Sequence, residues 1–135
     1  MVKPTVAAIL FADKIIEEKT NKKAIIGTFD RVYSPSFPMQ PFPWGIYLAL
    51  TGILGAVKFS LILDKPGLKE PLLRVEGEID GKEEDGIIEI PMNFSNFQFA
   101  EPGDYTLKVF VNDNVIGTRK LVVRIGAFPP PVKQG

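Results

Sequence analysis

Residues 99–107 read Phe-Ala-Glu-Pro-Gly-Asp-Tyr-Thr-Leu, and this stretch carries most of the information about the fold. Its Pro102-Gly103 dipeptide is a turn signal, because proline presets one backbone angle and glycine accepts unusual ones. After the turn, apolar side chains occupy every second position from Tyr105 to Val111. Successive side chains of a strand point to opposite faces, so this spacing predicts a strand with one buried face.

The same period of two recurs along most of the chain, and turn signals separate the runs. The other alternating runs cover 46–51, 57–63, 73–79, 88–94 and 121–125. About eight short strands at regular spacing are typical of a sandwich or a small barrel. Pro91 interrupts one run and has no backbone N–H, so its strand is expected at a sheet edge or at a bulge.

The first apolar segment, residues 5–18, fits two structures. Ile9 and Ile16 lie on a possible helical stripe, but Asp13 falls on the same stripe. The turn signal at 19–22 leads directly into another apolar run, which favours a hairpin. We therefore interpret residues 5–18 as a strand, with a helix as the alternative.

The spacing of Glu101, Gly103 and Tyr105 resembles one corner of immunoglobulin-like domains. There, a tyrosine opens a strand and its hydroxyl bonds back to the backbone a few residues upstream. These three residues are therefore candidate structural residues. We expect an all-β fold, an immunoglobulin-like antiparallel β-sandwich of about eight strands. A barrel, another sandwich topology or a plain hairpin after the Pro-Gly turn are the alternatives.

Residues 25–38 read Ile-Ile-Gly-Thr-Phe-Asp-Arg-Val-Tyr-Ser-Pro-Ser-Phe-Pro. This segment resembles a set of small bacterial immunoglobulin-like proteins of uncharacterised function. They share an I-G-x-F-D-R strand, a P-x-F-P turn and a later P-G-x-Y strand pair, and the likeness spans almost the whole chain. The resemblance implies an immunoglobulin-like sandwich and no established activity. It supplies no functional residues to transfer.

Composition excludes several classes of chemistry. The chain has no cysteine and no histidine, which removes thiolate nucleophiles, disulfides and the commonest general base and metal ligand. No phosphate-binding glycine loop or Gly-x-Ser-x-Gly motif occurs. We therefore expect no enzymatic activity, no cofactor and no metal.

The 16 basic and 16 acidic side chains give a formal net charge of zero. Nucleic-acid binding usually shows as a basic excess, so we expect no nucleic-acid partner. The longest apolar runs fall short of the ~18 residues that a membrane-spanning helix needs. The short run before Asp13 is also a poor signal peptide. We expect a cytoplasmic protein without membrane association, with one domain at 1–127 and a Pro-rich tail at 128–135.

The loop at 34–45 is the first candidate binding surface. It contains four prolines, Met39 and three aromatic residues. Prolines reduce the entropy lost on ordering, and aromatic and methionine side chains are enriched at interface cores. Phe37, Met39, Phe42 and Trp44 are therefore candidate partner-binding residues. The alternative is that these aromatic rings close one end of the hydrophobic core.

Two charged segments require an explanation. Asp30 and Arg31 stand next to each other in an expected strand at 25–33, so their side chains should point to opposite faces and not pair with each other. We interpret them as candidate structural residues, with a ligand-binding carboxylate as the alternative. The acidic run at 76–85 is interpreted as a solvated hairpin, with a calcium site as the alternative.

These patterns favour a non-catalytic protein-interaction module that uses a sheet edge or the 34–45 loop. One alternative is a structural subunit of a homo-oligomer or a larger assembly. Another is a binder of small molecules or carbohydrates, which would stack on Trp44 or Tyr47.

Overall fold

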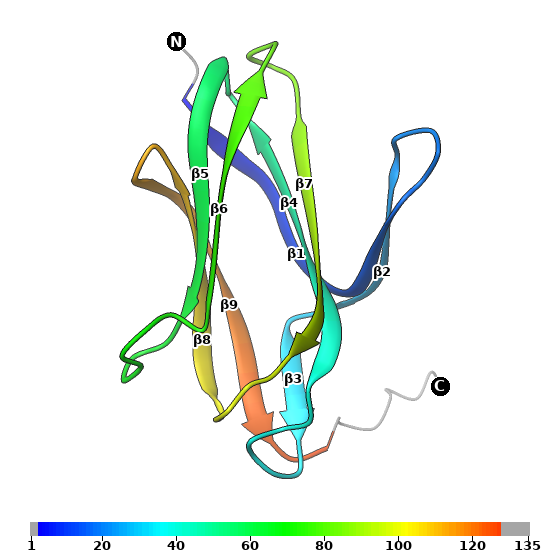
Figure 1. Cartoon of the computed structure of the whole chain (residues 1–135), viewed down its shortest axis with the longest axis vertical. Coiled ribbons are helices and arrows are strands. Elements are labelled where there is room, and N and C mark those ends of the chain that lie inside the picture. Colours follow the sequence, from blue (N-terminus) through cyan, green and yellow to red (C-terminus); the bar gives the residue numbers. More distant parts are fainter. Residues whose placement is uncertain (1–2, 128–135) are drawn as a thin grey trace, which may run out of the picture.

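The computed structural model describes residues 3–127, so the predicted tail at 128–135 lies outside the described residues. Within that range the chain forms nine β-strands (Figure 1). They are β1 (Thr5–Glu17), β2 (Lys23–Phe29), β3 (Arg31–Ser34), β4 (Phe42–Thr51), β5 (Gly55–Asp64), β6 (Leu73–Gly81), β7 (Ile88–Phe97), β8 (Gly103–Val111) and β9 (Asn114–Ile125). The prediction of an all-β fold is confirmed. Between residues 3 and 127, no helix is long and apolar enough to cross a membrane.

The strands form two sheets, and one short pair is parallel. The first sheet has the order β2-β1-β4-β7, and the second has the order β3-β9-β8-β5-β6. Only β3 and β9 pair in parallel among the described strands, and the other pairs are antiparallel. Two sequence predictions are confirmed here. Residues 5–17 form a strand, and Pro91 lies in β7 at a sheet edge.

The period of two places the apolar side chains between the sheets. Leu48 and Leu50 of β4 and Leu61 and Leu63 of β5 are each 0% exposed. They belong to one continuous cluster that includes buried residues of both sheets. Burial of apolar surface contributes roughly 25 cal/mol per Å², so this shared cluster is what holds the two sheets together.

The prediction of one strand at 25–33 is wrong. The strand ends at Phe29, Asp30 forms a bend, and the next strand begins at Arg31 in the other sheet. The chain crosses between the sheets because the Phe29 ring packs on Trp44, whereas Val32 is buried beside β9. This crossing also explains why the structure has one strand more than expected.

The bend at Asp30 also changes the expected charge geometry. Because the strand is interrupted, the two side chains do not point to opposite faces. Arg31 Nε lies 3.8 Å from Asp30 Oδ1, and both side chains are more than half exposed. The expectation that these two residues do not pair is therefore wrong. The contact is a surface ion pair, which contributes about 0–1 kcal/mol.

Tyr105 lies at a corner between the two sheets. Its side chain is 1% exposed, and its hydroxyl donates a hydrogen bond of 2.7 Å to the carbonyl oxygen of Glu101. The Glu101 carboxylate forms an ion pair with Lys65 Nζ. A Cβ at Gly103 would lie 2.8 Å from Lys65 Cδ, so glycine permits this side chain to cover the corner.

We predict that Tyr105→Phe lowers the free energy of unfolding by about 1 kcal/mol, because the hydrogen bond from the buried tyrosine side chain to the Glu101 carbonyl is lost. Tyr47→Phe is the matched control, since its hydroxyl bonds to Glu89 at the surface. The control substitution should lower the free energy of unfolding by less than about 0.5 kcal/mol. Denaturant unfolding measures both. Equal losses would contradict a special role for the corner.

The same tyrosine predicts a loss of stability in alkali. Burial, and then the charge of Glu101, raise the pKa of Tyr105 to about 12. An unfolded tyrosine has a pKa of about 10. The stabilisation is therefore fully present below pH ~10 and is lost as the pH rises toward ~12. Between pH ~10 and ~12, the free energy of unfolding should fall more steeply for the wild type than for Tyr105→Phe. Unfolding curves measured at several pH values test this, and parallel falls in the two proteins would refute the assignment.

Candidate functional site

A groove opens where β2, β3 and the loop after β3 meet, and we call it the β2–β3 groove. Its volume is about 380 Å³. It is lined by Asp13, Gly27, Thr28, Phe29, Arg31, Val32, Tyr33, Met39 and Phe42. Apolar and aromatic side chains dominate this lining, and the charges are few. Small-molecule and peptide sites have the same composition.

The topology explains why the groove lies at this place. β2 is the outer strand of the first sheet and β3 is the outer strand of the second. The chain passes from one to the other at Asp30, so the edges of the two sheets meet there. The loop at 35–41 turns below β3 and leads into β4 (Figure 1). Each wall of the groove therefore belongs to a different part of the fold.

The aromatic floor of the groove is attached to the core. Phe29 packs on Trp44 with ring centroids 6.0 Å apart, and Phe42 stacks on Phe99 at 6.1 Å. Both Phe29 and Phe42 are partly buried, so each ring has one face in the core and keeps some surface in the groove. A ligand would thus meet a rigid apolar surface and would not have to order it.

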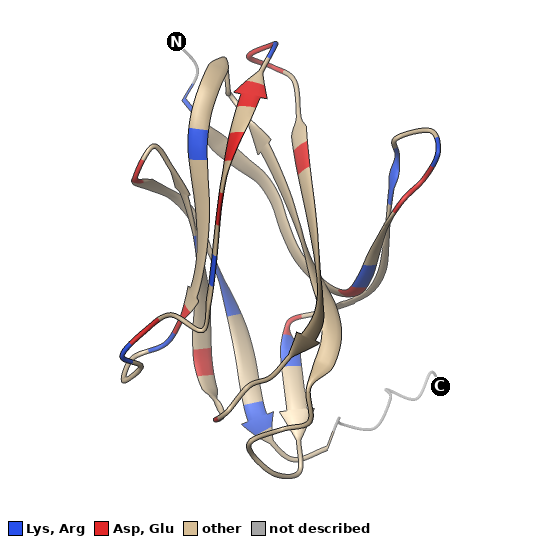
Figure 2. Ribbon diagram, viewed as in Figure 1, with Lys and Arg blue, Asp and Glu red and all other residues tan. Residues whose placement is uncertain are grey.

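Charges of both signs lie at the rim. Asp13 and Arg31 line the groove, and Asp30 forms an ion pair with Arg31. Figure 2 shows acidic and basic segments at the base of the β1–β2 hairpin and at the start of β3. The Asp13 side chain lies over Gly27, where a Cβ would be only 2.3 Å from Asp13 Oδ2. Gly27 also has a φ of +71°, which glycine adopts without a steric penalty. This glycine therefore fixes Asp13 at the upper rim.

Met39 and Phe42 are the two sequence-predicted binding residues that line the groove, and Phe37 packs on the core nearby. Backbone contacts fix the position of Met39. Its N–H donates to the Phe99 carbonyl at 3.2 Å, and its carbonyl accepts from Gln98 Nε2 at 2.8 Å.

The prediction that Trp44 offers its ring to a partner is wrong. The side chain is 1% exposed and lies within the core. Trp44 pairs with Phe94 of β7, and the rings of both sit among other aromatic rings. For this residue, the alternative that loop aromatics close one end of the core describes the structure.

The candidate structural residues lie in two different parts of the fold. Arg31 lines the groove and Asp30 lies at its edge, whereas Glu101, Gly103 and Tyr105 form the corner described above. Sequence reasoning missed Asp13, Phe29 and Tyr33 as groove residues. Asp13 carried a weak signal, since it interrupts an apolar run.

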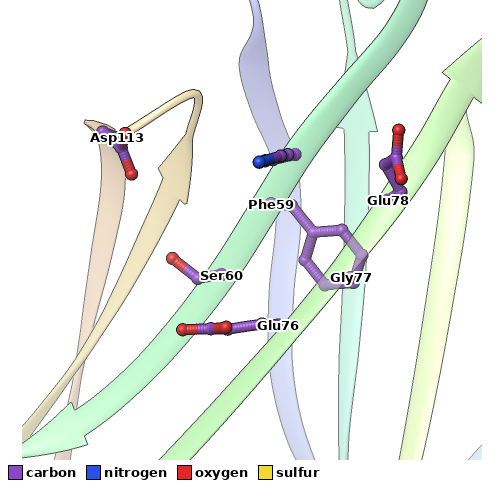
Figure 3. Close-up of a pocket in the computed structure, with 7 residues that line it drawn as sticks. Phe59, Ser60, Glu76, Gly77, Glu78 and Asp113 are labelled. Atoms are coloured by element: carbon purple, nitrogen blue, oxygen red, sulfur yellow. The ribbon is translucent and has the colours of Figure 1, made fainter.

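A second hollow of about 480 Å³ lies on β5 and β6 (Figure 3). Here Gly77 leaves room for the Phe59 ring, since a Cβ at Gly77 would lie 2.7 Å from it. Glu76, Glu78 and Asp113 bring acidic groups to this hollow. Within residues 3–127, no three acidic side chains gather closely enough to hold a metal ion. The calcium alternative for the acidic run therefore gains no support.

The β1–β2 hairpin projects from the rest of the molecule as an arm (Figure 1). Ile16 and Ile26 are about two-fifths exposed on it, at 40% and 42%. At its base, the Asn93 amide bonds to both the N–H and the carbonyl of Ile15, at 3.1 and 3.0 Å. Gly45 lies beneath this contact, where a Cβ would be 2.9 Å from Asn93 Oδ1. The arm is therefore held at a defined angle beside the groove.

A family model matches most of the chain. It is described as a family of unknown function (DUF6941), and it matches residues 7–124. The matched region includes all nine described strands in whole or in part, together with the residues that line the groove. No curated protein matches the chain.

We predict that Gly27→Ala destabilises the protein by more than about 1–2 kcal/mol, the cost of a left-handed backbone for an L-residue. Gly67→Ala is the matched control. Gly67 has a φ of +94°, and a Cβ added there would meet no atom within 4 Å, so that variant should show the backbone cost alone. Asp13→Ala should remove the excess cost of Gly27→Ala in a double-mutant cycle measured by chemical unfolding. Additive effects would contradict the close Asp13–Gly27 contact.

Proposed function

Because the chain belongs to DUF6941, a family of unknown function, we propose its role from the geometry of the β2–β3 groove. The protein is a non-catalytic interaction module that binds an extended polypeptide segment in this groove. One observation carries the proposal: an apolar groove with a rigid aromatic floor lies at the point where the open edges of both sheets meet.

The side chains of the groove fit this role. Phe29, Met39 and Phe42 supply apolar contact area, and aromatic and methionine residues are enriched in interface cores. Arg31 at the rim is more than half exposed and offers a hydrogen-bonding group to a polypeptide backbone or to a carboxylate. β3 has only four residues, so strand addition at its edge would give few backbone hydrogen bonds. Recognition therefore depends on the side chains.

The proposed fold subtype is an immunoglobulin-like sandwich. Three features support it: the facing orders β1-β4-β7 and β9-β8-β5-β6, the parallel edge pair of β3 and β9, and the corner at Tyr105. The Tyr105 hydroxyl bonds to a carbonyl four residues upstream, as the tyrosine corner of immunoglobulin domains does. In such domains, loops and edges carry the binding surfaces, which agrees with the position of the groove.

The composition supports the rest of the proposal. The chain has no histidine and no cysteine, and its formal net charge is zero. We therefore propose a cytoplasmic module that acts on proteins, with no role for nucleic acid or membrane. The carbohydrate alternative loses one of its two stacking residues, because the Trp44 ring is buried, whereas Tyr47 is partly exposed and its hydroxyl bonds to Glu89.

The alternative of an assembly subunit rests on the projecting arm. An isolated two-stranded hairpin is marginally stable in water, and this arm exposes Ile16 and Ile26. Contact with another copy would cover both side chains. Light scattering distinguishes the two roles, since an interaction module is expected to be monomeric and an assembly subunit to form a defined oligomer.

We predict that Met39→Glu weakens peptide binding at least about tenfold, because it places a charge on the apolar surface of the groove. The probe is a phage-displayed library of random linear peptides selected on the wild-type protein. Leu68→Glu is the matched control, since Leu68 is also a partly buried loop residue packed on the core but lies outside the groove. Both variants are first compared with the wild type by thermal unfolding.

Selected peptides should keep their affinity for Leu68→Glu and lose it for Met39→Glu. Peptides that bind Met39→Glu as well as the wild type would move the site away from the groove. A failure to select any extended sequence would argue against the proposed function.

A further inference from the structure

A smaller hollow of about 260 Å³ adjoins the β2–β3 groove, and we call it the Arg119 hollow. It is lined by Leu10, Thr28, Phe29, Asp30 and Arg119, and it shares Thr28 and Phe29 with the groove. We propose that this hollow binds an acidic side chain of the polypeptide that lies in the groove, with the Arg119 guanidinium as its partner. This inference rests on the proposed function, because it assigns the chemical class of the ligand at the same site.

Arg119 differs from the other arginines of the chain in lacking a carboxylate partner. The sequence contains four arginines, and Arg31, Arg74 and Arg124 each have a carboxylate oxygen at 3.8 Å or less. Arg119 is partly buried, yet it forms no ion pair with a carboxylate within residues 3–127. A cation withdrawn from water is stabilised by a negative partner. A ligand carboxylate in the Arg119 hollow would supply that charge.

Two contacts fix the orientation of the Arg119 side chain. Its Nη1 donates a hydrogen bond to the Ile9 carbonyl of β1, and its Cζ lies 5.5 Å from the centroid of the Phe11 ring. A guanidinium has five N–H donors in one plane, so donors remain for a carboxylate, which can accept two parallel bonds. Because the side chain is already held in place, little entropy is lost when it binds a ligand.

The neighbouring charges favour Arg119 over Arg31 as the partner of a ligand carboxylate. Arg31 is more than half exposed and already lies 3.8 Å from Asp30 Oδ1, so a further exposed ion pair there would add little affinity. Arg119 is less exposed, and a charge pair is stronger where less water screens it. Asp30 also lines the Arg119 hollow and would repel a negative ligand. Removal of the Asp30 charge should therefore strengthen binding.

The position of the hollow restricts the sequence of the ligand. Residues of an extended segment advance ~3.3 Å each, and their side chains alternate between two sides. The groove and the Arg119 hollow share two lining residues, so neighbouring side chains of one segment can reach both. We therefore expect an apolar residue in the groove and an aspartate or glutamate one or two positions away.

The test begins with peptides from the phage-displayed random library selected on the wild-type protein. An enriched sequence is synthesised as a fluorescent peptide with an amidated C-terminus, together with a version in which the acidic residue is replaced by its amide. Fluorescence anisotropy measures the affinity of both peptides for the wild type, Arg119→Gln and Arg124→Gln. Arg124→Gln is the matched control, since Arg124 lies on the same strand but lines neither the groove nor the Arg119 hollow.

We expect the enriched peptides to share an acidic residue beside an apolar one. Replacement of the acidic residue by its amide should weaken binding to the wild type at least about tenfold. Arg119→Gln should weaken binding of the acidic peptide by a similar factor, and the two changes together should cause no further loss. Arg119→Lys should recover only part of the affinity, because an ammonium lacks the planar fork of donors. Asp30→Asn should strengthen binding of the acidic peptide about twofold or more, and Arg124→Gln should leave it unchanged.

Enriched peptides without a shared acidic residue would overturn the inference, as would an amide peptide that binds as tightly as the acidic one. This comparison uses the wild-type protein, so it decides the question even if thermal unfolding shows that Arg119→Gln is not folded. Dependence on Arg119 that appears only in peptides with a free C-terminal carboxylate would assign the hollow to a chain end and overturn the side-chain assignment.

The two proposals fail differently. If the selected peptides lose affinity for Met39→Glu but keep it for a folded Arg119→Gln, only the acidic specificity fails and the groove remains the binding site. If the library yields no binding peptide, the proposed function fails, and the acidic specificity fails with it.

Discussion

The packing of aromatic rings around Trp44 is the interaction on which the rest of the structure depends. Five phenylalanine rings lie within 6.2 Å of the Trp44 ring, centroid to centroid: Phe11, Phe29, Phe94, Phe97 and Phe99. Phe99 continues the contact to Tyr105 of the second sheet at 5.2 Å. Burying one such ring system removes about 150–250 Å² from water, which stabilises the fold by about 4–6 kcal/mol. Among the described residues, Trp44 Nε1 is the one buried side-chain polar atom without a hydrogen-bond partner. The missing hydrogen bond lowers the stability of the fold by about 1–3 kcal/mol, so the net contribution of Trp44 remains favourable.

The same cluster couples the stability of the fold to the shape of the groove. Phe29 and Phe42 are at once outer members of the core and the floor of the β2–β3 groove. Their rings are fixed from below by Trp44 and Phe99, so the groove is preformed and does not depend on a ligand for its shape. For the same reason, deleting either ring would open a cavity in the core and would not report on binding alone. Met39 is different, because backbone hydrogen bonds hold it in place, and its side chain can therefore be changed at less cost to the fold.

The sequence predicts what is local and does not predict what depends on distant pairing. Alternation of apolar residues is a local signal, and it identified the strands from β4 to β9 and the first hairpin. The break at Asp30 has only a weak local signal: Phe29 and Val32 are three residues apart, so the alternation of apolar residues changes phase there. It arises because Phe29 belongs to a sheet centred on β1 and β4, whereas Val32 pairs with Val123, far along the chain. The burial of Trp44 has a similar origin. A proline-rich context suggests an exposed loop, but the register of β4 with β7 places this residue opposite Phe94.

The edges of the two sheets differ in how they resist the addition of a further strand. Exposed edges invite strand pairing, and proteins protect them with charge, proline or short strands. The edge strand β6 carries Glu76 and Glu78, and the edge strand β7 carries Pro91. β3 is protected only by its length of four residues, which is too short for a stable backbone ladder. A ligand at this edge must therefore gain its affinity from side chains packed on the aromatic floor. Proline supplies such contacts and has no N–H that would require a backbone partner. On the proposed function, a ligand segment with few backbone N–H groups therefore fits this edge better than a β-strand does.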